Sequence, residues 1–178
     1  MKKLDAATMP HGGTDLRDVR IRPYGVTDAD RLRRMSDRVS KQSLFTRFWS
    51  GSPYIPEYYV RAMDALDHWD REAMVALLDD DMIGIAEYVR DATRPHRADL
   101  AALVADPWQR RGLGLTLVSC LAPLAERRGI TEFNTDVILE NQGAMRAILV
   151  CWPVVGSALV DGAARFSLPL PMPVPVPG

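Results

Sequence analysis

A loop with two glycines, set between an apolar run and an amphipathic segment, constrains the fold of this chain more than any other feature. Residues 98–105 are mostly apolar and end at Asp106-Pro107, which predicts a central, largely buried strand. Residues 109–114 then read Gln-Arg-Arg-Gly-Leu-Gly, and the following segment has one apolar helical face. Because a helix N-terminus carries unpaired N–H groups and glycines let a ligand approach the backbone, this order predicts a pyrophosphate site.

Two other phosphate-binding loops fit the spacing poorly. A P-loop requires Gly-Lys-Ser/Thr, which is absent from this loop. A dinucleotide fingerprint requires a third glycine where Leu117 stands and a first glycine directly after the strand. Asp136 lies about where the ribose-binding acid of that motif would occur, but it falls within a predicted strand rather than at the end of one.

The remaining segments predict a single α/β domain. Besides the run at 98–105, the residue patterns predict strands over 19–24, 73–78 and 82–90, and helices over 27–39 and 56–67. A short acidic turn at residues 79–81 makes two of these strands an antiparallel hairpin. We place the domain at residues 18–168, between a flexible N-terminal segment (1–17) and a proline-rich C-terminal tail (169–178).

Composition argues against several classes of function. With 22 basic and 23 acidic residues the net charge is −1, so the overall field does not attract nucleic acid or an anionic membrane. No apolar stretch is long enough to cross a bilayer. Cys120 and Cys151 are too few for a disulfide framework or a zinc site, and the three histidines lack metal-ligand spacing. We therefore expect a cytoplasmic protein without a metal.

The loop resembles a known family signature. Residues 109–114 match the Gln/Arg-x-x-Gly-x-Gly/Ala pattern of the GNAT superfamily of CoA-dependent N-acyltransferases, and the order of elements from Val19 to Leu168 is similar to that family. The resemblance implies an α/β (α+β) fold. Its mixed, mostly antiparallel central sheet would have six or seven strands and about four flanking helices, with the cofactor at a splayed sheet edge. It also implies acetyl-CoA, or another short acyl-CoA, as co-substrate.

The resemblance assigns CoA contacts by position. The end of the fourth strand would offer backbone groups to the pantetheine arm, and the loop with the first helical turn would hold the pyrophosphate. Asn141 would hydrogen-bond the pantetheine from the far side, although it also fits a helix N-cap. The expected cofactor-binding residues are Val104, Ala105, Asp106, Gln109, Arg110, Arg111, Gly112, Leu113, Gly114, Leu115, Thr116 and Asn141.

The acetyl transfer that the resemblance implies needs an uncharged amine. A lysine-like amine has a pKa of about 10.4 and is almost wholly protonated at neutral pH, so a well-placed base speeds the reaction. The family often carries an acid on the fourth strand, and Asp99 is the match here; the alternative is an exposed acid paired with Arg97. Glu87 is the second candidate base. No tyrosine follows Asn141 to protonate the departing thiolate, as one does in many relatives.

A narrower resemblance concerns the acceptor. Residues 43–50 are similar to a stretch of bacterial protein-lysine acetyltransferases that acylate acyl-CoA synthetases. This implies a protein lysine as acceptor, with Arg47, Tyr54 and Tyr58 either shaping acceptor choice or packing. The tryptophans, including Trp49, are expected to pack.

Two alternatives to a lysine acetyltransferase remain open. The acceptor could instead be a small amine such as a polyamine, an aminoglycoside or an amino acid. The chain could also be a non-catalytic module that binds acyl-CoA and regulates a partner. The sequence leaves a homodimer open, and it predicts neither a nucleic-acid partner nor a membrane partner.

Overall fold

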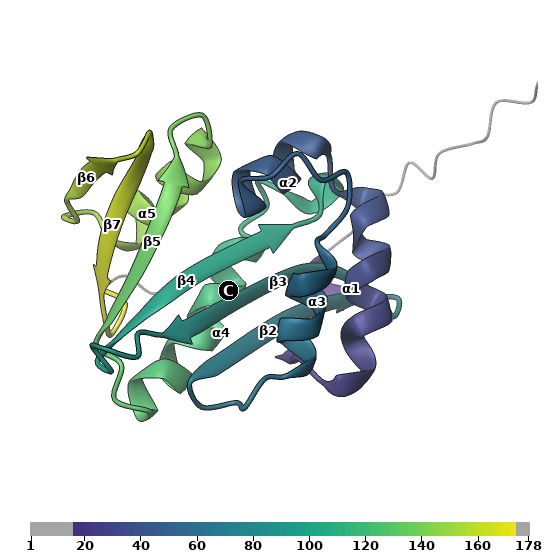
Figure 1. Cartoon of the computed structure of the whole chain (residues 1–178), viewed down its shortest axis with the longest axis horizontal. Coiled ribbons are helices and arrows are strands. Elements are labelled where there is room, and N and C mark those ends of the chain that lie inside the picture. Colours follow the sequence, from purple (N-terminus) through teal and green to yellow (C-terminus); the bar gives the residue numbers. More distant parts are fainter. Residues whose placement is uncertain (1–15, 174–178) are drawn as a thin grey trace, which may run out of the picture.

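The chain folds around one seven-stranded sheet, with the strands in the order β1-β2-β3-β4-β5-β7-β6 (Figure 1). This computed structural model describes residues 16–173. Neighbouring strands are antiparallel except for β4 and β5, which are parallel. The strands are β1 (Arg20–Pro23), β2 (Arg71–Leu78), β3 (Asp81–Arg90), β4 (Arg97–Val104), β5 (Glu132–Ile138), β6 (Ser157–Val160) and β7 (Ala163–Pro169).

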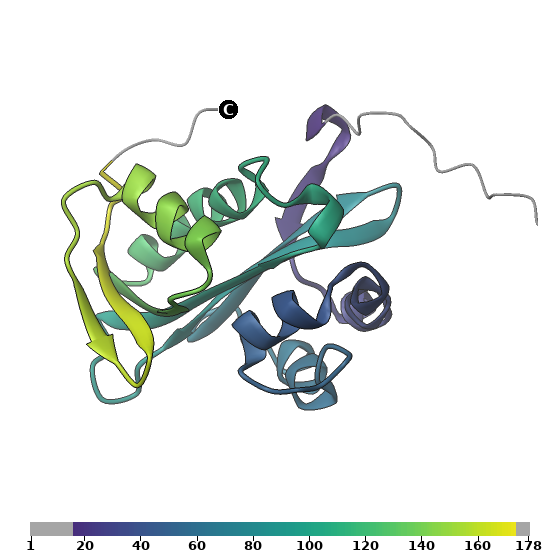
Figure 2. The same cartoon turned by 90° about the horizontal axis from the view of Figure 1, so that it is seen from above.

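Helices cover both faces of the sheet. Within residues 16–173 the α-helices are α1 (Ala29–Met35), α2 (Lys41–Phe48), α3 (Glu57–Asp64), α4 (Leu113–Arg127) and α5 (Gln142–Cys151). Figure 2 shows α1, α2 and α3 on one face and α4 and α5 on the other. Because the central strands are covered on both faces, β2 and β3 are buried along almost their whole length. None of these helices has the length and apolar character that a membrane-spanning segment needs.

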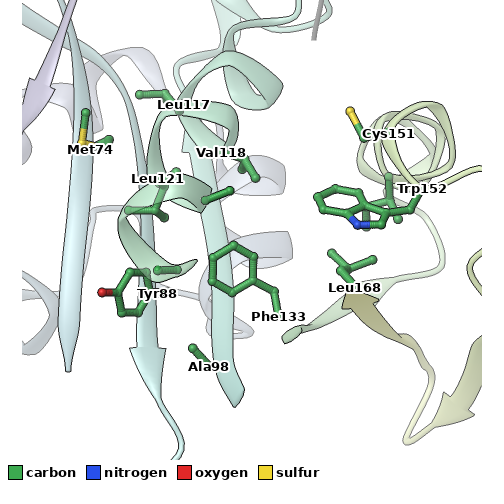
Figure 3. Close-up of a cluster of buried hydrophobic side chains, with 14 of the residues drawn as sticks. Met74, Tyr88, Ala98, Leu117, Val118, Leu121, Phe133, Cys151, Trp152 and Leu168 are labelled. Carbon is green, nitrogen blue, oxygen red and sulfur yellow. The ribbon is translucent and has the colours of Figure 1, made fainter. Parts of the chain in front are cut away.

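The sheet separates two hydrophobic cores. Alternate residues of β2 face opposite sides, so Met74 packs toward α4 while Val75 packs toward α1 and α3. In the α4–α5 core, Phe133 of β5 lies 6.0 Å from Tyr88 of β3, centroid to centroid (Figure 3). Trp152 closes the same core beside β7, where its Nε1–H donates to the carbonyl of Pro169 (2.8 Å). The half of the sheet that follows β4 is therefore anchored mainly through α4 and α5.

The fold predicted from the sequence is confirmed, with differences in detail. The predicted 27–39 helix is α1 flanked by 3-10 turns at Val26–Asp28 and Ser36–Arg38, and the 56–67 helix is the shorter α3. The pattern did not predict α2, in which Leu44 is the one fully buried residue, so its periodicity is weak. β7 extends one residue past the predicted domain end. Residues 1–15 and 174–178, which hold most of the predicted terminal segments, lie outside the described part.

β4 and β5 separate after a short contact. They pair through Arg97–Glu132, Ala98–Phe133 and Asp99–Asn134, and beyond these pairs the strands diverge as a V (Figure 1). The rest of β5 pairs with β7 instead. The backbone of β4 beyond Asp99 therefore lacks a strand partner on this side.

Candidate functional site

A groove of about 860 Å³ occupies the space where β4 and β5 diverge. Residues 100–104 of β4 and 135–137 of β5 line it from opposite sides, and the first turn of α4 closes one end. Side chains of α2 and α5 add the walls. This shape suits a long, narrow ligand laid along the edge of β4.

Antiparallel pairing with β3 determines which backbone groups of β4 face the groove. The N–H of Ala105 donates to the carbonyl of Ile83 (2.9 Å), so residues 101, 103 and 105 direct their backbone groups toward β3. The intervening Ala102 and Val104 direct theirs toward the groove. Gln109 Nε2 already donates to the Val104 carbonyl (2.9 Å), which leaves the Val104 N–H and both backbone groups of Ala102 for a ligand.

Ala105 and Asp106, at which pantetheine contacts were expected, use most of their backbone groups within the fold. The Ala105 N–H is bonded to Ile83, and its carbonyl accepts from Trp108. The Asp106 carbonyl accepts from the N–H of Gln109 (3.2 Å), and neither Ala105 nor Asp106 lines the groove. The sequence analysis did not predict that the backbone groups of Ala102 face the groove. The signal that could have found it is the two-residue alternation of backbone direction along a strand.

The first turn of α4 offers donors for an anion. Gly112 is the N-cap with φ +82°, and no side chain within the described residues caps this end. The first backbone hydrogen bond of the helix runs from the N–H of Thr116 to the carbonyl of Gly112 (3.0 Å). The N–H groups of residues 113–115 therefore lack partners within the helix. These donors and the helix dipole favour a phosphate group. These free donors lie within the segment Gly112 to Leu115, where the sequence predicts the pyrophosphate site.

Some side chains of the loop are hydrogen-bonded within the fold, whereas others face the groove. Gln109 Nε2 donates to Ser43 Oγ (3.1 Å) and to Asp106 Oδ1 (3.1 Å), which also accepts from the N–H of Ser40 (3.2 Å). These bonds join the loop to α2, so Gln109 and Asp106 hold the site together by their side chains. Arg110 is exposed and lines the groove, whereas Arg111 and Thr116 do not line it.

Asn141 is a helix cap that also faces the groove. Its Oδ1 accepts from the N–H of Ala144 (3.1 Å), so it is the N-cap of α5. It also lines the groove, opposite β4. The cap uses the oxygen and leaves the amide nitrogen for hydrogen bonding to a ligand.

Asp99 lies in a second hollow that adjoins the groove. This hollow has a volume of about 510 Å³, and both spaces share Leu100, Thr135 and Asp136 in their linings. Asp99 is exposed, and its side chain makes no hydrogen bond or ion pair with another described residue. The alternative pairing with Arg97 is not observed, because the Arg97 guanidinium pairs with Glu132 (3.0 Å).

The surroundings of Asp99 raise the pKa of its carboxyl group above the ordinary value. Partial desolvation by the walls of the hollow raises the pKa of Asp99, and the negative charges of Asp91 and Asp136 raise it further. Two other carboxylates of the hollow have arginine partners: Asp91 with Arg94 (2.8 Å) and Asp136 with Arg165 (2.7 Å). Asp99 is therefore the carboxylate in this hollow that is left to receive a proton or a cation.

Glu87 lies in a different environment from the one expected of a free base. Its side chain is 5% exposed, and its two oxygens accept from Arg47 Nη2 (2.6 Å) and from Arg71 Nη2 (2.8 Å). It lines neither the groove nor the hollow. The Arg47 guanidinium also stacks on the rings of Phe48 and Tyr59, at 4.7 and 4.9 Å. Glu87 thus fixes Arg47 in the groove wall.

The aromatic residues near the site differ in their burial and in whether they line the groove. Trp152, which follows α5, is buried and offers no hydroxyl. Tyr54 and Tyr58 are exposed and outside the groove lining. Trp49 was expected to pack, but it is half exposed and lines the groove. No group of acidic, histidine or cysteine side chains suited to a metal occurs within residues 16–173.

Comparison with known proteins identifies relatives of the chain. The sequence model of the acetyltransferase (GNAT) family matches residues 42–148. Acetyltransferase Pat of Mycolicibacterium smegmatis is 30% identical over 132 residues, which cover 72% of this chain and 39% of that longer protein. The chain therefore spans well under half of this relative.

Solved structures show the same fold. The GNAT domain of S. lividans PAT superposes with a TM-score of 0.78 at 28% identity, over 85% of this chain and 90% of that one. The structure of yncA, a putative acetyltransferase from Salmonella typhimurium with its cofactor acetyl-CoA, superposes with a TM-score of 0.68 at 14% identity. The latter covers 89% of this chain and 98% of that chain.

Proposed function

The chain belongs to the GNAT acetyltransferase family, and we propose that it transfers the acetyl group of acetyl-CoA to the side-chain amine of a protein lysine. One observation carries this proposal: a single groove leads from the uncapped first turn of α4, along the free edge of β4, to the hollow that contains Asp99. The groove provides for both substrates, because one end suits phosphates and the other suits an amine.

The chain's own residues fit acetyl-CoA. The N–H groups of residues 113–115 and the guanidinium of Arg110 would hold the pyrophosphate. The backbone of Ala102 and Val104 and the amide of Asn141 would hold the pantetheine arm between them. Bound acetyl-CoA supplies an acyl carbon activated as a thioester. The acetyl-CoA in the yncA structure supports the same ligand for this chain.

Asp99 would act as the general base. An acceptor ammonium entering the hollow donates a proton to the Asp99 carboxylate, and the neutral amine nitrogen then attacks the acyl carbon. The raised pKa of Asp99 narrows the gap between its proton affinity and that of the amine, which makes this transfer less unfavourable. Since Trp152 offers no hydroxyl, solvent water would protonate the departing thiolate, whose thiol has an ordinary pKa of about 8.5.

The acceptor assignment rests on sequence and charge. Residues 43–50 resemble a stretch of protein-lysine acetyltransferases, and they form most of α2 and the residues after its C-terminal end, in the groove wall. The unpaired carboxylate of Asp99 complements one ammonium group. A lysine on an acyl-CoA synthetase in the cytoplasm is the partner we propose, with a small amine as the alternative.

A second function is a non-catalytic acyl-CoA-binding module. The buried Trp152, in place of a hydroxyl donor, favours it. Such a module would bind acetyl-CoA in the same groove and would release no thiol with any amine.

The test is free-thiol release from acetyl-CoA by the purified chain, over a panel of lysine peptides, acyl-CoA synthetases and small amines. We expect release that depends on a lysine acceptor. Release with small amines alone would assign the alternative acceptor, and saturable acetyl-CoA binding without any release would favour the regulatory module. The chain's own lysines, Lys2, Lys3 and Lys41, are the sites to check for self-acetylation.

A further inference from the structure

Trp49 ends α2 in a conformation that disfavours a bulky side chain. Its backbone is left-handed (φ 54°, ψ 28°), and its N–H closes the helix by donating to the carbonyl of Phe45 (2.8 Å). Glycine is the usual residue at such a helix end, because a Cβ is strained there. Strain of this kind persists where the side chain has another use.

The indole is not used to fill a core. It is 47% exposed, whereas a tryptophan that stabilises a fold buries most of its surface. It belongs to neither hydrophobic core, and instead it lines the groove. Gln42 and Thr46 line the groove from the same helical row, at spacings of seven and three residues from Trp49.

The direction of α2 places Trp49 away from the phosphate site. Ser40 and Ser43, at the start of α2, are bonded to Asp106 and Gln109 of the loop. Arg47, near its end, is bonded to Glu87, which lies opposite Ala101 on β4. The helix therefore runs back along β4, away from the pyrophosphate site. Its 8 residues span about 12 Å, so Trp49 lines the groove about that far from the Ser40 end of α2, which is bonded to the phosphate loop.

We propose that Trp49 forms a wall of the acceptor channel and selects primary amines carried on an unbranched alkyl chain. This inference rests on the proposed function and names its substrate class. The indole face would pack against the methylene groups of a lysine side chain, and its π-system would attract the ammonium group on its way to Asp99. An acceptor with a shorter alkyl chain would offer the indole fewer methylene groups to pack against.

The test compares three proteins on two acceptors. The proteins are wild type, Trp49→Gly and Trp49→Phe, where glycine suits the left-handed backbone and phenylalanine keeps an aromatic ring. The acceptors are one peptide with a lysine and the same peptide with diaminopropionic acid at that position, which shortens the alkyl chain. Thiol release gives kcat and KM for each pair, and melting temperatures report folding.

We expect Trp49→Gly to raise KM for the lysine peptide about tenfold, through loss of the indole contact. The loss on the short-chain peptide should be much smaller than the loss on the lysine peptide, the melting temperature of Trp49→Gly should not fall, and Trp49→Phe should keep most of the lysine preference. Equal losses on both peptides, unchanged kinetics, or a clear fall in the melting temperature of Trp49→Gly would each overturn the proposal.

A binding readout separates this proposal from the proposed function. The indole N–H resonance of Trp49, assigned through Trp49→Phe, should shift on titration with the lysine peptide and not with the short-chain peptide. If wild type releases no thiol with any amine, the acetyltransferase function fails. In that case a selective shift still supports the assignment of Trp49, and the lack of one overturns it.

Discussion

Asp99 and Glu87 carry the same functional group in opposite environments. Asp99 is exposed in a hollow and has no arginine partner among the described residues, while Glu87 is buried between Arg47 and Arg71. The sequence could place both acids on neighbouring strands, because the apolar runs at 82–90 and 98–105 predict those strands. It could not show which acid was neutralised, because Arg47 and Arg71 reach Glu87 from 40 and 16 residues away.

Replacing Asp99 tests its role as base. We expect Asp99→Asn to lower kcat on a lysine acceptor by about 100-fold or more, because proton transfer from the ammonium is lost. The melting temperature at neutral pH should not fall. A pKa raised by folding means that ionised Asp99 slightly destabilises the folded state, so its removal costs no stability. Full activity in Asp99→Asn, measured by thiol release, would exclude this base.

Replacing Glu87 should give the opposite result. Glu87→Gln leaves two arginines without their buried partner, and we expect a loss of about 3–5 kcal/mol in the free energy of unfolding. Urea denaturation measures this loss. A Glu87→Gln protein that is as stable as wild type but inactive would instead make Glu87 the catalytic group.

The pH dependence follows from the raised pKa of Asp99. Activity requires the carboxylate, so kcat/KM should fall as the pH decreases through the pKa of Asp99, which lies above its ordinary value. Asp136→Asn removes one negative charge that raises this pKa and frees the nearby Arg165. The acidic limb of the pH profile should therefore move to lower pH in Asp136→Asn. A limb that stays in place or moves upward would contradict the assignment.

At the scale of elements, the α4 N-terminus was the most predictable part of the site. The order of strand, glycine loop and helix predicted it from local sequence alone, because the donors belong to the helix itself. α2 was not predicted, and neither was its bonding to the loop through Gln109. That contact joins residues 66 positions apart and depends on packing that no local pattern contains.

The two glycines of the loop should differ in their tolerance of alanine. Gly112 has φ +82°, so Gly112→Ala strains the backbone by about 1 kcal/mol and should disturb the first turn of α4. A Cβ at Gly114 would meet Val104 Cγ2 at 3.7 Å, an ordinary contact. Calorimetric titration should show acetyl-CoA binding weakened in Gly112→Ala and nearly unchanged in Gly114→Ala. A greater loss of binding in Gly114→Ala than in Gly112→Ala would contradict the proposed pyrophosphate site at the first turn of α4.

At the scale of the whole molecule, the site is a gap between two parts of one sheet. β4 and β5 share only the residue pairs at 97–99 and 132–134, and beyond them each strand pairs on its far side alone. The family resemblance implied this splay, while hydrophobic periodicity could predict the strands but not where their pairing stops. The hollow of Asp99 likewise arises from residues of β4, β5 and β7 together, which sequence could not assemble.

A ligand that spans this gap should stabilise both sides together. We expect saturating acetyl-CoA to slow hydrogen exchange in residues 100–104, 113–116 and 135–137, because each segment lines the groove or begins α4. Exchange in the β2–β3 hairpin should change little. Protection confined to that hairpin would place the ligand elsewhere.

The most direct test of the central claim is mass spectrometry of a lysine peptide after incubation with acetyl-CoA and either the wild-type chain or Asp99→Asn. The account predicts one acetyl group on the lysine side chain with wild type, and a large loss of that product with Asp99→Asn at equal acetyl-CoA occupancy. If wild type binds acetyl-CoA and leaves every lysine and small amine in the panel unmodified, the chain is not the acetyltransferase proposed here.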